Sequence, residues 1–328
     1  MVTSTPSTSE QSPLLMPGSE TLSKRRMMPQ TIAHRGFHEV VPENTMMAFK
    51  AAVAEKVEAL ETDLHLSRDG VIVLCHDASL VRTFGKKAKI RDLDWEELSQ
   101  LRTVREPHLT MPRLIDLLEY LAEPDLEHIW LMLDIKPKPG PDAEVMMRTI
   151  SETLASVPTK RPWSERVTPC CWRPNYIKFS LQYLPDYHVT HLSATTNYAR
   201  YLTKVPNISF SILQFSLATP SGTKFIRDMK KLGIPVYVWT SNSADWMEWG
   251  IRQELDGVIT DQVTLFHQVC DRMSETSRPA IPMTSKLSRT IRFWGQMMVY
   301  SILIAIFMPM DWLMNGLPRS QVRKSLTL

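Results

Sequence analysis

Two histidines and five charged residues lie within or directly after short apolar runs of the chain. Histidine acts as a general acid or base near neutral pH because its ordinary pKa is about 6.5. Arginine and lysine neutralise the charge that develops on phosphoryl oxygens, so the set suits cleavage of a phosphate diester. We predict that the histidines are catalytic and that two cations bind phosphate: His34 and His76 in the first role, Arg35 and Lys136 in the second.

The three acidic residues of the set predict a metal site. Glu61 and Asp63 are two positions apart in one apolar run, so on a strand both side chains project from the same face. Two such carboxylates repel each other unless a cation lies between them. Asp134 would add a third oxygen ligand, and no cysteine belongs to the motif. This composition favours Mg²⁺ or Ca²⁺ over zinc.

Alternating strands and helices must position these residues. Short apolar runs from residue 31 onward predict strands, and stretches with helical apolar spacing separate most of them. Eight or nine strands in about 240 residues favour an α/β fold, the (β/α)8 TIM barrel, over a doubly wound sheet. The predicted strands are Thr31–Arg35, Ala59–His65, Val71–His76, Ile129–Lys136, Val167–Trp172, Tyr187–Leu192, Ser209–Phe215, Val236–Thr240 and Gly257–Thr260.

A barrel predicts that functional side chains gather at the C-terminal ends of its strands. Polar residues do lie at or near the C-terminal ends of the first, third and fourth predicted strands. They are His34 and Arg35, then His76 and Asp77, then Asp134 and Lys136. The connection between the second and third strands, residues 66–70, is too short for a crossover helix. This pair therefore forms either a hairpin or an irregular corner of the barrel.

Other polar and aromatic residues near these ends have more than one interpretation. Trp239 forms either an apolar wall for a substrate or part of the barrel packing. Glu43, Asn44 and Thr45 are expected to cap the first helix and to brace the loop beside His34.

Motifs along most of the chain resemble the glycerophosphodiester phosphodiesterase family, with order and spacing kept from about residue 31 to 265. The resemblance implies a TIM barrel with a divalent metal. The motifs are Ala33-His34-Arg35-Gly36, Pro42-Glu43-Asn44-Thr45, Glu61-x-Asp63, Asp69-Gly70, His76-Asp77, Met111-Pro112-x-Leu114, Asp134-x-Lys136, Val238-Trp239-Thr240 and Gly257-Val258-Ile259-Thr260-Asp261.

The resemblance also implies the role of each matching residue. The two histidines match the family's acid and base, Glu61 and Asp63 its metal ligands, and Arg35 and Lys136 its phosphate contacts. Asp134 stands where many members have glutamate, so the metal would sit deeper or bind through water. The basic, hydrophobic C-terminal tail makes the chain most similar, within that family, to the fungal phosphatidylglycerol phospholipases C.

Composition divides the chain into five segments. Residues 1–30 contain fourteen Ser, Thr or Pro and no sustained apolar run, which predicts a disordered N-terminal segment. The barrel domain is expected over residues 31–270, followed by a polar linker over 271–292. A hydrophobic membrane tail, either an anchor or a hairpin, is expected over 293–317, and residues 318–328 form a basic end.

The uncharged stretch 293–310 leaves three alternatives open. Its eighteen residues are close to the roughly 20 that a spanning helix needs. Basic residues flank it on both sides, so the positive-inside rule selects no orientation. A monotopic hairpin or interfacial anchor, a single span and a soluble packing helix all fit this pattern.

The charge distribution separates the tail from the body. Residues 272–328 hold eight Lys or Arg and two acidic residues, while the chain as a whole has a net charge of +3. The body is therefore mildly acidic, which excludes a nucleic-acid-binding body, and the tail suits anionic lipid headgroups. The four cysteines form no C-x-x-C pair, which predicts reduced thiols. We expect attachment to a membrane that faces a reducing compartment, such as the surface of the endoplasmic reticulum, a lipid droplet or a mitochondrion. No protein partner follows from the sequence.

Together these features predict a metal-dependent phosphodiesterase of the phospholipase C type. It would convert phosphatidylglycerol to diacylglycerol and glycerol 3-phosphate through a cyclic phosphate, with the histidines as acid and base. The 34 residues between His76 and Met111 leave no room for a large insertion domain, so we expect an open mouth that accepts a lipid. Three alternatives remain: a glycerophosphodiesterase acting on deacylated soluble diesters, a lysophospholipase D, and a non-catalytic lipid-binding protein.

Overall fold

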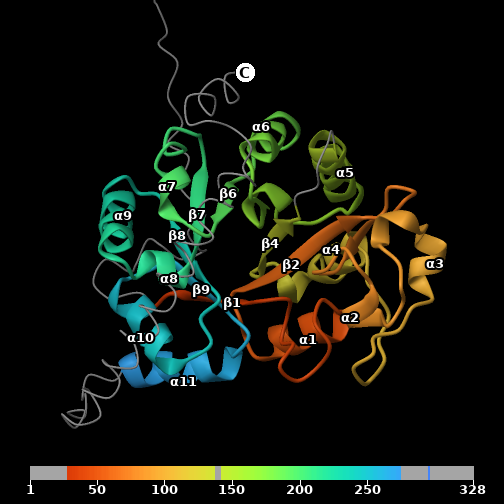
Figure 1. Ribbon diagram of the computed structural model, residues 1–328, viewed down its shortest axis with the longest axis horizontal. Coiled ribbons are helices and arrows are strands. Elements are labelled where there is room, and N and C mark those ends of the chain that lie inside the picture. The colour runs from red at the N-terminus through yellow and green to blue at the C-terminus, as the bar shows by residue number, and fades with distance from the viewer. Residues whose placement is uncertain (1–27, 137–141, 275–294, 296–328) are drawn as a thin grey trace, which may run out of the picture.

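A closed barrel of eight parallel strands forms the body of the chain in the computed structural model, which describes residues 28–136, 142–274 and residue 295. Neighbouring strands pair in parallel, and β1 pairs with both β2 and β9, which closes the barrel (Figure 1). The barrel strands are β1 (Gln30–Ala33), β2 (Ala59–Leu66), β4 (Trp130–Ile135), β5 (Val167–Cys171), β6 (Val189–Ser193), β7 (Ile208–Leu213), β8 (Val236–Trp239) and β9 (Gly257–Thr260). The predicted TIM barrel is confirmed.

Helices surround the barrel and cover the outer faces of its strands (Figure 1). The α-helices are α1 (Met46–Ala54), α2 (Val81–Phe84), α3 (Trp95–Ser99), α4 (Leu114–Leu121), α5 (Asp142–Ser156), α6 (Pro174–Tyr183), α7 (Thr196–Ala199), α8 (Gln214–Leu217), α9 (Pro220–Lys231), α10 (Ala244–Arg252) and α11 (Val263–Ser274). Short 3₁₀ turns lie at η2 (Ile90–Asp92), η3 (Pro124–Leu126) and η4 (Trp163–Glu165).

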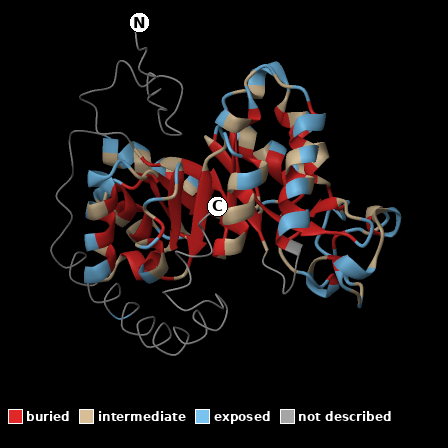
Figure 2. Cartoon of the chain, turned by 90° about the horizontal axis from the view of Figure 1, so that it is seen from above, coloured by how far each residue is buried: buried red, intermediate tan, exposed pale blue. Residues whose placement is uncertain are grey.

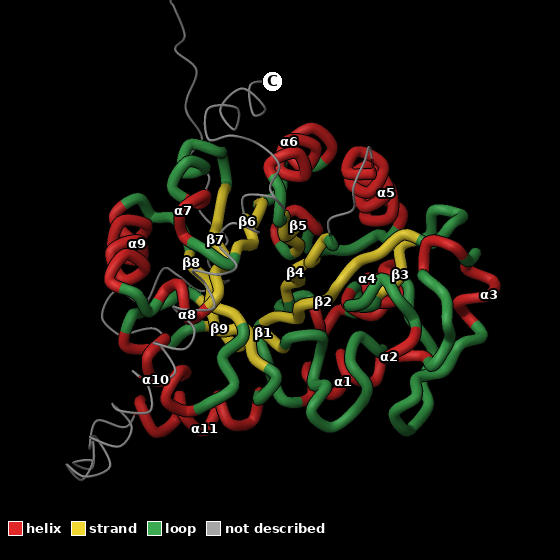
Figure 3. Tube along the Cα trace, viewed as in Figure 1, coloured by secondary structure: helices red, strands yellow, loops and turns green. Residues whose placement is uncertain are grey.

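The second and third strands form a hairpin, which decides between the two alternatives. β3 (Ile72–Leu74) runs antiparallel to the end of β2, with Leu64 opposite Leu74 and Leu66 opposite Ile72. The turn between them contains Gly70, whose φ of 84° lies in the left-handed region that favours glycine. β2 thus continues beyond its pairing with β4, and β3 carries the chain back toward the barrel (Figure 3).

Alternation of side chains along the strands separates two cores. Ile32, Met132 and Cys170 belong to a cluster that fills the barrel. The residues that alternate with such inward-facing positions along each strand point outward and pack under the helices. Figure 2 shows the buried strands at the centre and exposed residues on the outer helical surfaces. Side chains two positions farther along the same strands share the inner face and reach the C-terminal end of the barrel. That end is the mouth.

The segment between β3 and α4 builds a small lobe beside the barrel. Residues 77–110 carry α2, η2 and α3, which lie together at one edge of the molecule (Figure 1). The lobe and its base share a separate apolar cluster that includes Leu80, Phe84, Ile90 and Leu98. The insertion is therefore short, as expected, and nevertheless has packed structure of its own.

The terminal segments lie largely outside the described residues. β1 begins at Gln30, inside the segment expected to be disordered, and residues 1–27 are not described. α11 continues through Ser274, into the expected linker. The rest of the linker, the hydrophobic segment 293–317 apart from residue 295, and the basic end fall outside the described residues. Among the helices that the structure does describe, none has the length and apolar character needed to cross a bilayer.

Candidate active site

A pocket of about 170 Å³ opens at the mouth of the barrel. Seven of the eight residues predicted for the site line it, and Asp63 is buried next to it. The lining residues are His34, Arg35, Glu61, His76, Asp134, Lys136, Trp172, Leu192, Trp239, Thr240 and Ile259. The strand positions that the sequence selected therefore converge on one pocket.

Three buried carboxylates form the candidate metal centre. Oxygen atoms of Glu61, Asp63 and Asp134 lie within 4.8 Å of one another, because β2 and β4 pair with Asp63 opposite Asp134. Burial and the neighbouring carboxylates Asp63 and Asp134 raise the pKa of Glu61 well above its ordinary value. Asp63 Oδ1 is buried and accepts no well-aligned hydrogen bond among the described residues. Three buried carboxylates with hard oxygen atoms so close together fit Mg²⁺ or Ca²⁺, as predicted.

Two cations lie against these carboxylates. Lys136 Nζ is 2.7 Å from Asp63 Oδ1 and 2.5 Å from Asp134 Oδ2, and Arg35 Nε is 3.3 Å from Asp63 Oδ2. Burial would lower the pKa of Lys136, but Asp134, Asp63 and Glu61 together raise it, so the ammonium stays charged. Burial likewise opposes ionisation of Asp63, while Lys136 and Arg35 lower its pKa. Positive charge is thus fixed beside the metal centre, where phosphoryl oxygens would bind.

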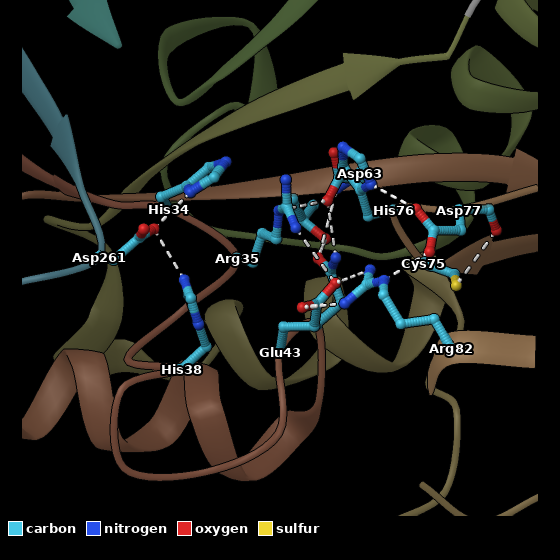
Figure 4. Close-up of polar contacts among 12 residues, drawn as sticks. His34, Arg35, His38, Glu43, Asp63, Cys75, His76, Asp77, Arg82 and Asp261 are labelled. Carbon is cyan, nitrogen blue, oxygen red and sulfur yellow. Dashed lines mark hydrogen bonds and ion pairs between the residues drawn. The ribbon is translucent and has the colours of Figure 1, made fainter. Parts of the chain in front are cut away.

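His34 follows β1 and is held by Asp261, which follows β9. His34 Nδ1 is 2.5 Å from Asp261 Oδ1 (Figure 4). When Nδ1 carries the proton and donates it to Asp261, Nε2 is the unprotonated nitrogen, and it lies 4.0 Å from Glu61 Oε2. The same Asp261 oxygen accepts from His38 Nε2 at 2.7 Å, and Asn242 binds the other oxygen. Burial lowers the pKa of His34 despite the carboxylate. A neutral imidazole in a fixed tautomer can accept a proton at Nε2.

His76 reaches the mouth through the hairpin, one of the two alternatives that the sequence left open. It follows the third strand, as expected, and this strand is antiparallel to β2. The hairpin brings the chain back beside the metal centre, where the Cys75 amide donates to the Asp63 carbonyl at 3.0 Å. His76 Nδ1 then lies 2.7 Å from Asp77 Oδ1. Each catalytic candidate therefore has its own carboxylate partner.

A charged network connects the surroundings of His76 with Arg35 (Figure 4). Arg82, from α2 of the lobe, donates from Nε to Asp77 Oδ2 at 2.6 Å and from both Nη atoms to Glu43. Glu43 Oε1 also accepts from Arg35 Nη1 at 3.2 Å. The network thus runs from Asp77, the partner of His76, to Arg35 beside the metal centre.

The structure adds supporting residues that the sequence did not assign. Trp172 Nε1 donates to Asp134 Oδ1 at 2.7 Å, and Asn44 Nδ2 donates to Asp63 Oδ2 at 2.7 Å. Thr45 caps α1 as expected, accepting from the Ala48 amide. Asn44 and Glu43 bind Arg35, through the Arg35 carbonyl and guanidinium, which braces the loop beside His34 as expected. Trp172 was recognisable in principle, because it lies two positions after Cys170, which points into the barrel.

Trp239 forms part of the pocket wall together with Trp172. The two rings meet edge to face with centroids 5.6 Å apart, and Trp239 Nε1 donates to the Ser211 carbonyl at 3.1 Å. Trp239 lines the pocket and also packs against the core that fills the barrel, so its role as a substrate wall stays a prediction.

The geometry agrees with comparisons to known proteins. The model of the glycerophosphoryl diester phosphodiesterase family matches residues 34–265. A glycerophosphodiester phosphodiesterase of Caldanaerobacter subterraneus subsp. tengcongensis is 27% identical over 244 residues, covering 72% of this chain and 95% of that protein. A lysophospholipase D of Rattus norvegicus is 40% identical over 75 residues, which cover 23% of this chain and 24% of that protein.

Solved structures share the fold. A phosphodiesterase of Oleispira antarctica in complex with the product sn-glycerol-3-phosphate has a TM-score of 0.66 and 24% identity, covering 74% of this chain and 97% of that chain. A glycerophosphoryl diester phosphodiesterase structure from Silicibacter pomeroyi has a TM-score of 0.66 and 20% identity, covering 75% of this chain and 94% of that chain. Together with the site, the match over residues 34–265 shows that the chain belongs to the glycerophosphoryl diester phosphodiesterase family, whose enzymes hydrolyse phosphoric diesters.

Proposed function

We propose that this enzyme hydrolyses phosphatidylglycerol to diacylglycerol and glycerol 3-phosphate, an activity of the phospholipase C type. The observation that carries the proposal is the size and lining of the pocket. Its volume of about 170 Å³ is below the roughly 300–1,000 Å³ of pockets for drug-sized ligands. The charged floor suits a phosphoryl group with one small alcohol, and the acyl chains of a lipid would stay outside the mouth.

The chemistry requires a hydroxyl group next to the phosphoester. Phosphatidylglycerol offers the 2-hydroxyl of its glycerol headgroup, whereas choline and ethanolamine headgroups offer none. One imidazole takes the proton of this hydroxyl as its oxygen attacks phosphorus, and the bond from phosphorus to the diacylglycerol oxygen breaks. The other imidazole protonates that oxygen. Water then opens the cyclic phosphate to glycerol phosphate.

The protein prepares each group for this sequence of bond changes. Asp261 and Asp77 fix the orientation of His34 and His76, while Lys136 and Arg35 place positive charge beside the phosphoryl position. A divalent cation held by Glu61, Asp63 and Asp134 would stabilise negative charge on a phosphoryl oxygen.

The C-terminal sequence supports a lipid substrate. Residues 293–310 are uncharged and have basic residues on both sides, which suits a segment that meets a membrane with anionic lipid. The expected resemblance to fungal phosphatidylglycerol phospholipases C rests on this tail alone and stays a prediction. We propose attachment to a membrane that faces a reducing compartment, at the endoplasmic reticulum, lipid droplets or mitochondria.

A second candidate is hydrolysis of lysophospholipids on the headgroup side. The partial match to a rat lysophospholipase D favours it, and lysophospholipids also carry a hydroxyl next to the phosphoester. The same attack would then expel the headgroup alcohol, and water would open the resulting cyclic phosphate to lysophosphatidic acid. Deacylated glycerophosphodiesters satisfy the same chemical requirement without any lipid.

The products distinguish these candidates. Purified full-length protein is incubated with Mg²⁺ or Ca²⁺ and one substrate at a time. The four substrates are phosphatidylglycerol vesicles, phosphatidylcholine vesicles, lysophosphatidylcholine and glycerophosphoglycerol. Diacylglycerol from phosphatidylglycerol but not from phosphatidylcholine, identified by mass and abolished by a chelator, is the expected result. Lysophosphatidic acid would support the second candidate, and turnover of glycerophosphoglycerol alone would contradict a lipid substrate. His34→Ala serves as the inactive control.

A further inference from the structure

Three lysines of the lobe beside the mouth have no acidic partner among the described residues. Residues 81–91 contain five basic residues and no acidic residue. Arg82 binds Asp77 and Glu43 within the site network, and Arg91 lies 3.7 Å from Asp92. Over the described ranges, no ion pair within 4.0 Å involves the other three, Lys86, Lys87 and Lys89. Their charge is available to a partner.

These lysines lie at the tip of a short hairpin. A bridge joins Ser79 to Lys89, and the Leu80 amide donates to the Ala88 carbonyl at 3.0 Å. Gly85, with a φ of 68°, ends α2 and turns the chain back. The hairpin is therefore a fixed support for the lysines and for the residues that pack beside them.

Exposed valines surround this tip. Val81 is 52% exposed, Val104 is 59% exposed and Val40, in the loop after β1, is 54% exposed. Their segments are bonded together, since the Val104 amide donates to the Thr83 carbonyl at 2.8 Å. Arg105 donates to the carbonyls of the β1 loop at His38, Glu39 and Val41. We call the set Val40, Val81, Val104, Lys86, Lys87 and Lys89 the valine–lysine rim.

The rim adjoins, along the chain, residues that bind the carboxylate partners of His34 and His76. Arg82, next to Val81, binds the carboxylate partner of His76, and His38 in the Val40 loop binds the carboxylate partner of His34. A surface that contacts this rim is thereby brought to the edge of the pocket.

We infer that the valine–lysine rim docks the enzyme on the surface of an anionic lipid bilayer, so that the mouth faces the headgroups. The inference rests on the proposed lipid substrate and deepens it. Unpaired lysines complement anionic headgroups, each contributing about fivefold to affinity, and the valines can enter the interfacial layer. This surface lies within the barrel domain and is distinct from the C-terminal tail.

Docking is tested first without reference to catalysis. An environment-sensitive fluorophore is attached to full-length Val104→Cys in a Cys270→Ser background. We expect a blue shift with phosphatidylglycerol vesicles, weaker at high salt, and none with phosphatidylcholine vesicles. The matched control is Leu232→Cys, because Leu232 is also 59% exposed and lies beside Lys230 and Lys231, but precedes β8 at the opposite end of the barrel. No shift at position 104, or an equal shift at 232, would overturn the inference.

Turnover provides the second test. The double variant Lys86→Glu, Lys87→Glu should cleave phosphatidylglycerol in vesicles at least tenfold more slowly and turn over soluble glycerophosphoglycerol unchanged. Lys231→Glu should affect neither substrate. Equal losses on both substrates, or no loss on vesicles, would contradict docking through the rim. A fluorophore shift at position 104 without any lipid turnover would support the docking surface and refute the proposed function, so the two failures are distinguishable.

Discussion

Arg82 holds both carboxylate oxygens of Glu43, with Nη1 2.8 Å from Oε2 and Nη2 2.7 Å from Oε1. Its Nε simultaneously binds Asp77, so a single guanidinium joins the loop after β1 to the partner of His76. Such a planar fork satisfies two carboxylates in fixed directions, which a lysine ammonium cannot reproduce. Arg82 is thus a positioning residue that makes the orientation of His76 depend on the lobe.

Replacing Arg82 should impair turnover more than substrate binding. We expect Arg82→Ala to lower kcat by about 10- to 100-fold with a small change in KM, and Arg82→Lys to recover little of the loss. Steady-state kinetics on glycerophosphoglycerol measure both constants. A merely structural role would instead appear as a lower Tm with kcat per folded molecule unchanged.

Asp261 should govern His34 in a similar way. Asp261→Asn removes the negative charge that fixes the Nδ1–H tautomer, so we expect kcat to fall by about 100-fold or more. His38→Gln keeps a donor for the same carboxylate oxygen and should cost less than about fivefold. The comparison of kcat for the two variants checks this order, and equal losses would contradict it.

Metal dependence should follow the three carboxylates. A chelator is expected to abolish turnover, and Asp134→Asn should raise the Mg²⁺ or Ca²⁺ concentration for half-maximal rate by about 10- to 100-fold. Trp172→Phe, which removes the donor to Asp134, should raise it by a smaller factor. The turnover rate measured over a series of metal concentrations gives these shifts. Unchanged metal dependence in Asp134→Asn would exclude that residue as a ligand.

His191 should make stability depend on pH outside the active site. Its Nδ1–H donates to the Cys171 carbonyl at 3.0 Å, and Nε2 is buried with no partner among the described residues. Burial lowers its pKa to about 4. Between that value and the ordinary 6.5 the unfolded chain binds more protons, so the free energy of unfolding decreases as pH falls through this range, by about 3 kcal/mol.

Denaturant unfolding at pH 7 and at pH 4.5 measures this effect. His191→Gln keeps a donor for Cys171 and should show a shallower loss of stability on acidification than the native chain. Parallel slopes for the native chain and His191→Gln would contradict the assignment.

Strand periodicity predicted the inward-facing residues of the site but not the contacts between distant segments. Glu61, Asp63 and Asp134 were identified because alternation along a strand fixes which face each side chain occupies. The path of the chain to His76 was not identified, because the direction of β3 depends on the turn after β2, and the sequence left open whether this turn forms a hairpin or an irregular corner.

The supporting partners were missed for a related reason. The contact from Arg82 to Glu43 spans 39 residues, and that from His34 to Asp261 spans 227. Neither has a local pattern, since each arises when the closed barrel brings its loops together. The packed core of the lobe also had no periodic pattern, because its short helices and turns contribute one or two apolar residues each.

The two ends of the lobe are joined at its base. The Leu74 amide donates to the Pro112 carbonyl at 2.9 Å, and Val73 pairs with Arg113, so the chain leaves and re-enters the barrel at one point. Doubling the length of a loop closed in this way costs only about 0.6 kcal/mol of extra closure entropy. The part of the lobe beyond Asp77 and Arg82 is therefore exchangeable. Its length and outer surface can change, and with them the membrane or substrate presented to the mouth, while the barrel and its hydrolytic groups keep their positions.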